Sequence, residues 1–148
     1  MFGLWSRTTL ACLALVHAPA NGGPAGSVAV GTQDETPYYV SDGGAPGPTV
    51  VITAGVHGDE PAGSAAAEQI RCWPLSRGRL VVLPRANVRG LAAGTRLTPA
   101  APGAERNLNR AFPTAARAVA VGALASNLWA FAAGQRPDWL IDLHEGTD

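Results

Sequence analysis

Three side chains that can bind a metal ion stand where predicted secondary-structure elements begin or end. His57 and Glu60 are three residues apart, and His144 lies close to the end of the sequence. Gly55 and Gly58 allow the tight turn that would bring the first two side chains together. Two histidines and one carboxylate are a sufficient ligand set for a catalytic zinc ion, which keeps a further position open for water. The spacing therefore predicts a zinc site formed by His57, Glu60 and His144.

The elements around these residues predict an α/β fold. Residues 49–54 are rich in β-branched side chains, as expected for a strand buried on both faces, and residues 61–73 favour a helix. Residues 79–83 and 139–143 are two further apolar strands, and the alanine-rich residues 115–133 predict a second helix. The alternation of strands and helices indicates a three-layer sandwich with a mostly parallel or mixed central sheet.

The active site of such a sheet lies at the carboxyl ends of its strands. His57 follows the first of the three strands and His144 follows the last, so the two are expected to meet there. Asp142 lies two residues before His144 and points to the same face of its strand. We expect its carboxylate to accept the imidazole N–H of His144, although a strand-end cap is the alternative. Asp59 is expected to contact the backbone at the start of the helix.

The remaining segments are less regular. Residues 27–30 and 37–41 favour short extended segments, and residues 85–113 form a long, arginine-rich connection that is expected to be mostly irregular. Connections of this length inside a compact domain are usually functional.

Composition argues for one globular domain and against a polyanionic partner. Hydrophobic residues make up 47% of the chain, and eleven basic residues balance eleven acidic ones. Every basic residue is an arginine, and the arginines are scattered without a cluster. This pattern argues against a surface that binds nucleic acid or an anionic membrane.

Residues 1–20 are typical of a secretory signal peptide. They contain Arg7, an apolar run over residues 10–16 and the cleavage pattern Ala18-Pro19-Ala20. A periplasmic or secreted protein is expected, with a short N-terminal extension of a cytoplasmic protein as the alternative. The apolar run is much shorter than the roughly 20 residues that a stable membrane span needs. Residues 21–148 would then be the mature part of the chain.

Three motifs resemble a known family. Residues 54–63 (AGVHGDEPAG) are similar to the HxxE zinc motif of the succinylglutamate desuccinylase and aspartoacylase branch of the zinc carboxypeptidase superfamily. Residues 107–113 (NLNRAFP) are similar to its DLNR segment, and residues 141–146 to its third-ligand strand. The resemblance implies a carboxypeptidase/phosphorylase-hydrolase-like fold that is apparently truncated here. It also implies that residues 21–148 are the N-terminal part of a zinc hydrolase catalytic domain. Asn107 replaces the usual aspartate, and Val88 replaces the proline of the family's ANP turn.

The resemblance also implies roles for residues that bind substrate. Asn109 and Arg110 match the family's substrate-binding pair. An arginine suits this role, because a guanidinium binds a carboxylate through two hydrogen bonds. Arg96 resembles a second substrate arginine, with a solvated loop arginine as the alternative. The general-base glutamate of the family lies downstream of the third ligand and is not identified within this chain. Glu145 is not assigned that role, and three other arginines are expected to be surface residues: Arg85, Arg89 and Arg106.

The expected function is zinc-dependent hydrolysis of an amide bond adjacent to a carboxylate. The substrate would be a small molecule or peptide with a free carboxylate. The enzyme would be either a metallocarboxypeptidase, and thus a protease, or an N-acyl amino acid deacylase. One alternative is a non-catalytic zinc-binding or ligand-binding remnant, and another is a truncated fragment. The 148-residue chain by itself is expected to be inactive, because it contains no identified general base.

Overall fold

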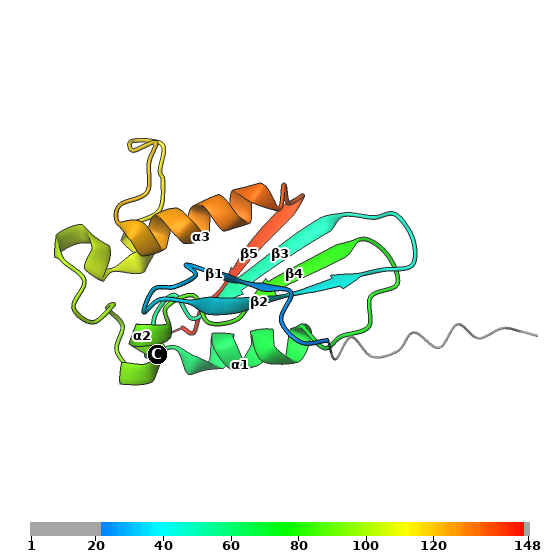
Figure 1. Cartoon of the computed structure of the whole chain (residues 1–148), viewed down its shortest axis with the longest axis horizontal. Coiled ribbons are helices and arrows are strands. Elements are labelled where there is room, and N and C mark those ends of the chain that lie inside the picture. Colours follow the sequence, from blue (N-terminus) through cyan, green and yellow to red (C-terminus); the bar gives the residue numbers. More distant parts are fainter. Residues whose placement is uncertain (1–21, 147–148) are drawn as a thin grey trace, which may run out of the picture.

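The computed structural model describes residues 22–146, which form one mixed sheet with helices on both faces (Figure 1). The strands are β1 (Gly26–Val28), β2 (Thr36–Asp42), β3 (Thr49–Ala54), β4 (Arg79–Leu83) and β5 (Trp139–Leu143). The helices are α1 (Pro61–Ile70), α2 (Val88–Ala93) and α3 (Ala123–Gly134), with two short 3-10 helices at Gly103–Arg106 and Leu108–Arg110. The predicted signal segment, residues 1–20, lies outside the described residues.

The sheet has the order β1-β2-β4-β3-β5. β3 is parallel to both β4 and β5, whereas β2 pairs antiparallel with β4 and β1 pairs antiparallel with β2. The parallel centre is made of the β-branched runs, and Val51 and Val81 there are completely buried. The predicted mixed sheet is therefore confirmed, with its parallel strands in the part that carries the candidate ligands.

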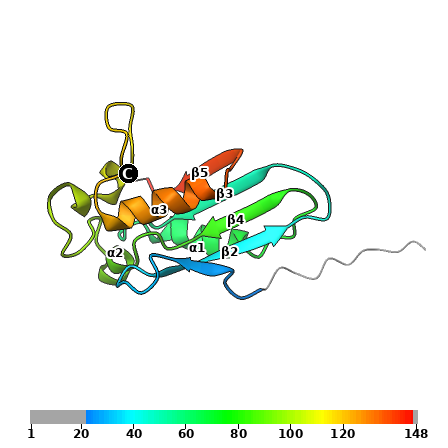
Figure 2. The same ribbon diagram turned by 45° about the horizontal axis from the view of Figure 1, so that its top comes forward.

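The two longest helices cover opposite faces of the sheet (Figures 1 and 2). α1 packs on β3 and β4, where its small residue Ala67 lies against Ile52 and Val82. α3 packs on the other face, where Leu124 and Leu128 join a second apolar cluster. The three-layer sandwich is thus closed by two separate cores, one on each side of the sheet.

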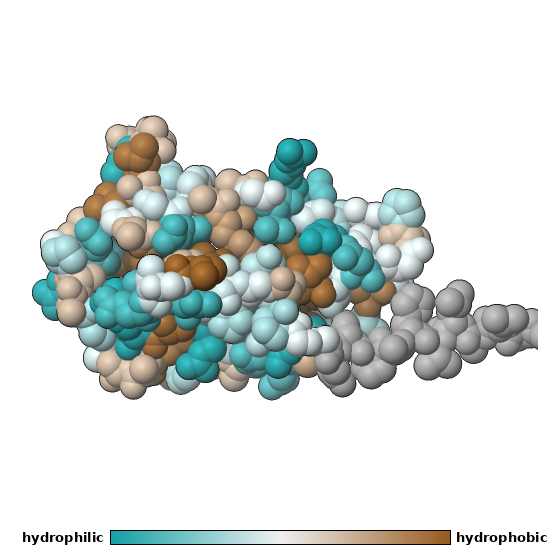
Figure 3. Space-filling model, viewed as in Figure 1, coloured by the Kyte–Doolittle hydropathy of each residue, from teal (hydrophilic) through white to brown (hydrophobic). Residues whose placement is uncertain are grey.

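Two segments between β4 and β5 differ from the sequence-based expectation. Residues 85–113 contain α2, which begins because the buried Asn87 side chain accepts the backbone N–H of Gly90. α3 begins at Ala123 and not at residue 115, because Arg117 instead holds a turn by donating to the carbonyls of Arg110 and Phe112. The loop that precedes α3 carries hydrophobic surface (Figure 3), with Val119 exposed. Within residues 22–146, no helix is both long and apolar enough to cross a membrane.

Candidate metal centre

The parallel pairing of β3 with β5 brings the candidate ligands together. Ala54, the last residue of β3, lies opposite Leu143, the last residue of β5. The chain then continues to His57 on one side and directly to His144 on the other. Glu60 is the residue from which α1 begins, so the strand-to-helix turn presents it to the same place.

Two glycines make this turn possible. Gly55 has a φ of 72°, and an added Cβ would lie 2.5 Å from the Ser64 hydroxyl oxygen. At Gly58 an added Cβ would lie 1.9 Å from the carbonyl carbon of Gly90, because the turn packs directly on α2. The buried Asn87 also donates to the carbonyl of Val56, so α2 and the turn are held as one unit.

The three predicted ligands converge on one position. Nδ1 of His57 lies 2.8 Å from Glu60 Oε1, and Nδ1 of His144 lies 2.6 Å from Glu60 Oε2. The potential ligand atoms all lie within 4.8 Å of one another. His57 is 1% exposed and Glu60 6% exposed, whereas the His144 side chain is 32% exposed. The centre is therefore buried on one side and open to solvent beside His144.

Each imidazole is held from behind by an oxygen acceptor. Asp142 Oδ2 lies 2.8 Å from His144 Nε2, and the other Asp142 oxygen accepts the Thr53 hydroxyl at 2.7 Å. The carboxylate therefore reaches the histidine for which the sequence predicted it. The Nε2 atom of His57 lies 3.2 Å from Asn107 Oδ1. The sequence flagged Asn107 only as a departure from a motif, and it contained no signal for this contact.

Glu60 is a carboxylate held in its charged form. Burial by itself would raise its pKa, but four hydrogen-bond donors outweigh this effect and lower the pKa from 4.5 to about 2. The donors are His144, His57, the backbone N–H of Glu145, and Arg96. For His144, burial lowers the pKa, but the hydrogen bond to Glu60 and the charge of Asp142 raise it above 6.5.

The predicted substrate residues are placed differently from one another. Arg96 reaches the centre and donates to Glu60 Oε1 at 2.7 Å, although its side chain is 47% exposed. Arg110 is exposed and donates to the carbonyl of the partly buried Asn109 at 3.3 Å. The structure therefore brings Arg96 to the triad, while the contacts of Arg110 are with its own 3-10 helix and turn.

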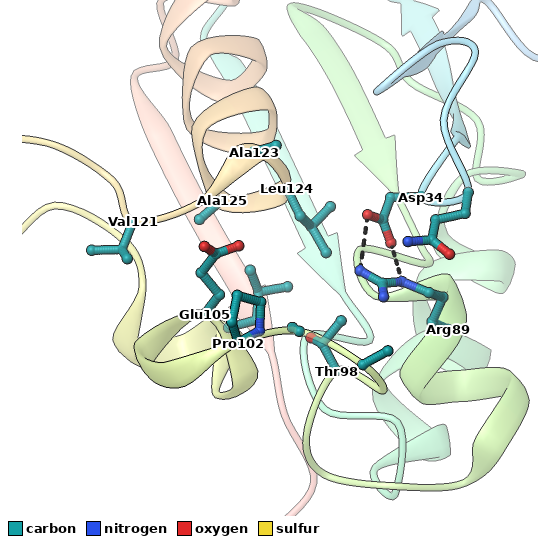
Figure 4. Close-up of a pocket in the computed structure, with 13 residues that line it drawn as sticks. Asp34, Arg89, Thr98, Pro102, Glu105, Val121, Ala123, Leu124 and Ala125 are labelled. Carbon is teal, nitrogen blue, oxygen red and sulfur yellow. Dashed lines mark hydrogen bonds and ion pairs between the residues drawn. The ribbon is translucent and has the colours of Figure 1, made fainter.

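Three other residues correct or extend the sequence-based expectations. Arg89 is not a surface residue, because it forms a partly buried ion pair with Asp34 at 2.7 and 3.1 Å (Figure 4). The first turn of α1 receives its carboxylate from Glu145, which accepts the N–H of Ala62 at 3.1 Å, and not from Asp59. Glu145 thereby joins the end of β5 to α1.

Two neighbouring pockets share the lining residues Thr98 and Ala100. The pocket in Figure 4 measures about 230 Å³ and is lined by the Asp34–Arg89 pair, Glu105 and the start of α3, but by none of the three candidate ligands. A more open pocket of about 540 Å³ is lined by Asp59, Arg96 and Arg106. Because Arg96 contacts Glu60, this second pocket adjoins the triad and is the candidate place for a substrate.

The residues present fit a zinc ion. Two imidazoles and one carboxylate are a ligand set that catalytic zinc sites use, and both imidazoles present Nδ1 to the shared position. Each outer nitrogen has an oxygen partner, which is how proteins orient histidine ligands. A buried carboxylate between two imidazoles is thus explained as part of a metal centre.

Comparison with known proteins agrees with this geometry. The chain matches the sequence model of the succinylglutamate desuccinylase/aspartoacylase catalytic domain over residues 46–148. Over 70 residues it is 37% identical to N-alpha-acetyl-L-2,4-diaminobutyric acid deacetylase of Halomonas elongata, an alignment that covers 45% of this chain and 20% of that protein.

Solved structures share the fold. A succinylglutamate desuccinylase/aspartoacylase from Rhodobacter sphaeroides superposes with a TM-score of 0.61 at 33% identity, covering 76% of this chain and 34% of that one. The murein-tripeptide amidase MpaA of Escherichia coli O157 has the same fold, with a TM-score of 0.57 at 22% identity, covering 87% of this chain and 65% of that one. The chain spans about a third of the Rhodobacter protein. Since the family match covers most of the sequence, the chain belongs to the succinylglutamate desuccinylase/aspartoacylase catalytic domain family.

Proposed function

We propose that this protein is a zinc-dependent hydrolase that cleaves an amide bond adjacent to a carboxylate. Family membership supports an amide-bond hydrolase. The observation that carries the zinc assignment is the convergence of His57, Glu60 and His144 within 4.8 Å, at the carboxyl ends of two parallel strands. Zinc is favoured over magnesium or calcium because imidazole nitrogen suits zinc, whereas those two ions prefer oxygen ligands alone.

The residues of the centre have distinct roles in this proposal. His57, Glu60 and His144 hold the ion, and Asp142 orients His144 through its Nε2–H. A zinc ion bound there would supply Lewis-acid activation of water and of the scissile carbonyl. The buried side of the centre excludes bulk water, and the open side beside His144 admits the substrate.

The substrate we propose is a small molecule or peptide with a free carboxylate. Arg96 lines the open pocket and already holds one carboxylate, that of Glu60, so its guanidinium is placed to bind another at the same edge. Asn109 and Arg110 would bind the substrate from the following turn, as the family resemblance implies. The N-acyl amino acid and the peptide C-terminus remain the two substrate classes, and the name of the Halomonas relative favours the first.

The proposed location is the periplasm or the exterior of the cell. It is supported by the signal-like composition of residues 1–20. An exported enzyme would encounter envelope peptides more often than cytosolic metabolites. Edman sequencing of the mature protein would test the location, with a first residue at position 21 as the expected result.

Zinc binding is the first test of the proposal. The chain should bind about one zinc ion, and His57→Ala, Glu60→Ala and His144→Ala should each bind less than a tenth as much after dialysis. Glu68→Ala is the matched control, because this glutamate lies on α1, the helix that follows Glu60, and pairs with Arg71. Zinc content by atomic emission gives the answer, and full retention by the three variants would contradict the assignment.

Turnover separates the proposed enzyme from the non-catalytic alternative. The gene product as the cell makes it should hydrolyse N-acyl amino acids or the C-terminal bond of short peptides, and a chelator should abolish the activity. Stoichiometric zinc without turnover on either substrate class would instead support a zinc-binding module. The assay also decides between the deacylase and the carboxypeptidase type.

A further inference from the structure

The two histidines of the centre differ in what holds their outer nitrogen. His144 Nε2 lies 2.8 Å from a carboxylate oxygen of Asp142. His57 Nε2 lies 3.2 Å from the amide oxygen of Asn107, so its partner carries no charge. The two imidazoles otherwise have matching contacts, because each directs Nδ1 to one oxygen of Glu60.

Asn107 is well placed to hold a ring in one orientation. It immediately precedes the 3-10 helix Leu108–Arg110, and its own carbonyl accepts the N–H of Arg110 at 2.8 Å. The neighbouring Leu108 is 1% exposed and anchors the turn in the apolar core. The side-chain amide is therefore presented to His57 from a fixed backbone.

The chemistry of the ring determines what this contact does. When Nδ1 binds a metal ion, Nε2 must carry the hydrogen and needs an acceptor. Asn107 Oδ1 supplies it. A neutral amide polarises the N–H less than a carboxylate does, so it strengthens the metal bond of the opposite nitrogen less.

We propose that Asn107 is a positioning residue that fixes His57 as an Nδ1 ligand, and that its amide makes His57 the weaker of the two imidazole ligands. The inference rests on the proposed metal centre. A carboxylate at position 107 should then tighten zinc binding, and an apolar side chain of the same size should weaken it.

The test compares Asn107→Leu and Asn107→Asp in the whole chain by competitive titration of zinc against a chromophoric chelator. Asn107→Leu should weaken zinc binding by about 10-fold or more, the usual effect of losing such a partner. Asn107→Asp should bind zinc several-fold more tightly than the wild type. Asn127→Leu and Asn127→Asp are the matched controls, because Asn127 is exposed on α3, and they should leave the affinity unchanged.

A second measurement reports on the ring itself. In the zinc-loaded chain, long-range ¹H–¹⁵N NMR spectra should show a protonated Nε2 on His57, with its hydrogen protected from solvent exchange. This protection should persist in Asn107→Asp and disappear in Asn107→Leu, an effect that general loosening of the fold would not confine to His57. The aspartate variant keeps the inference testable even where the leucine variant folds poorly.

The outcomes separate this inference from the proposed function. If the wild type binds zinc, and Asn107→Leu has the same zinc affinity and the same His57 spectra as the wild type, the role of Asn107 is overturned but the metal centre is not. Weaker binding by Asn107→Asp than by the wild type would overturn the claim that the amide limits His57. A wild-type chain that binds no zinc would overturn the metal centre and the inference together.

Discussion

Glu60 is the residue on which the contacts of the centre converge. One of its oxygens accepts from His57 and Arg96, and the other accepts from His144 and the backbone N–H of Glu145. These donors come from three separate segments of the chain, because His144 and Glu145 are adjacent. A carboxylate that is 6% exposed needs such partners, because burying an unpaired charge is costly. The same contacts hold the three candidate ligands close together.

The charge of this network predicts how the metal-free chain responds to pH. The lowered pKa of Glu60, about 2, means that its contribution to stability is present above pH 4.5 and is lost as the pH falls towards 2. The raised pKa of His144 means that its contribution is present below pH 6.5 and is lost as the pH rises through the folded-state value. The metal-free chain should therefore be most stable between pH 4.5 and 6.5.

Thermal unfolding in the presence of a chelator, followed from pH 3 to 9, measures this optimum. The melting temperature should fall by several degrees on either side, and Glu60→Gln should flatten the acid side. A melting temperature that rises steadily up to pH 9 would contradict the predicted contribution of His144. Added zinc should shift the optimum to higher pH, since the ligands bind zinc in their deprotonated forms.

Arg110 is the residue for which the family resemblance and the structure offer different evidence. The resemblance assigns it to the substrate, whereas its guanidinium here contacts the Asn109 carbonyl. If it binds a substrate carboxylate, Arg110→Lys should lower kcat/KM by roughly ten- to hundredfold, because an ammonium lacks the planar fork. Zinc content should not change. Arg136→Lys is the control, because Arg136 is exposed just beyond the end of α3. Equal kinetics for both variants on a carboxylate-bearing substrate would remove Arg110 from the site.

At the scale of elements, the site depends on the close packing of α2 against the β3–α1 turn. Gly58→Ala places a Cβ 1.9 Å from the carbonyl carbon of Gly90, so the backbone of one element has to move. We expect a loss of about 3 kcal/mol or more in the free energy of unfolding, at the upper end of overpacking effects, together with weaker zinc binding. Gly134→Ala is the control, because an added Cβ there meets no atom within 4 Å. Chemical denaturation and zinc titration of both variants measure the difference.

The elements that the sequence predicted well are those whose signal is local. β3, β4 and β5 were predicted with their observed bounds, because dense β-branched or apolar runs favour buried strands at any position. The predicted start of α3 was wrong, since alanine content does not reveal a turn held by Arg117. α2 was missed, because it depends on the cap from Asn87.

The same distinction applies to the site. His57, Glu60 and His144 could be predicted from residue type and from their places at strand ends. The contacts of Asn107 with His57 and of Glu145 with α1 could not be predicted, because Asn107 and Glu145 lie outside the predicted strands and helices, where residue type does not fix the position of a side chain. Arg89 was misjudged for that reason too, since its partner Asp34 belongs to the segment between β1 and β2.

At the scale of the whole molecule, burial is uneven across the sheet. The central strands β3 and β4 contain residues that are fully buried, whereas β5 lies at an edge of the described sheet. Three consecutive residues of β5 remain 65%, 48% and 42% exposed: Trp139, Leu140 and Ile141. Beside them, Trp129 of α3 and Leu140 line an apolar pocket of about 160 Å³. An apolar edge of this kind is a template for pairing with another strand.

This edge predicts concentration-dependent association of the 148-residue chain. Ile141 is opposite Ile52 of β3, and its exposed side chain belongs to the edge strand through which such pairing would occur. Ile141→Lys should weaken association by about tenfold, because burying an isoleucine side chain stabilises a contact by about 1.5–3 kcal/mol and a lysine at an edge opposes pairing. Val119→Lys is the matched control, since Val119 is also a β-branched apolar residue and is 69% exposed, but lies in the loop before α3. Sedimentation velocity over a range of concentrations would distinguish the two variants. Equal effects of both would show that association depends on general surface hydrophobicity and not on the β5 edge.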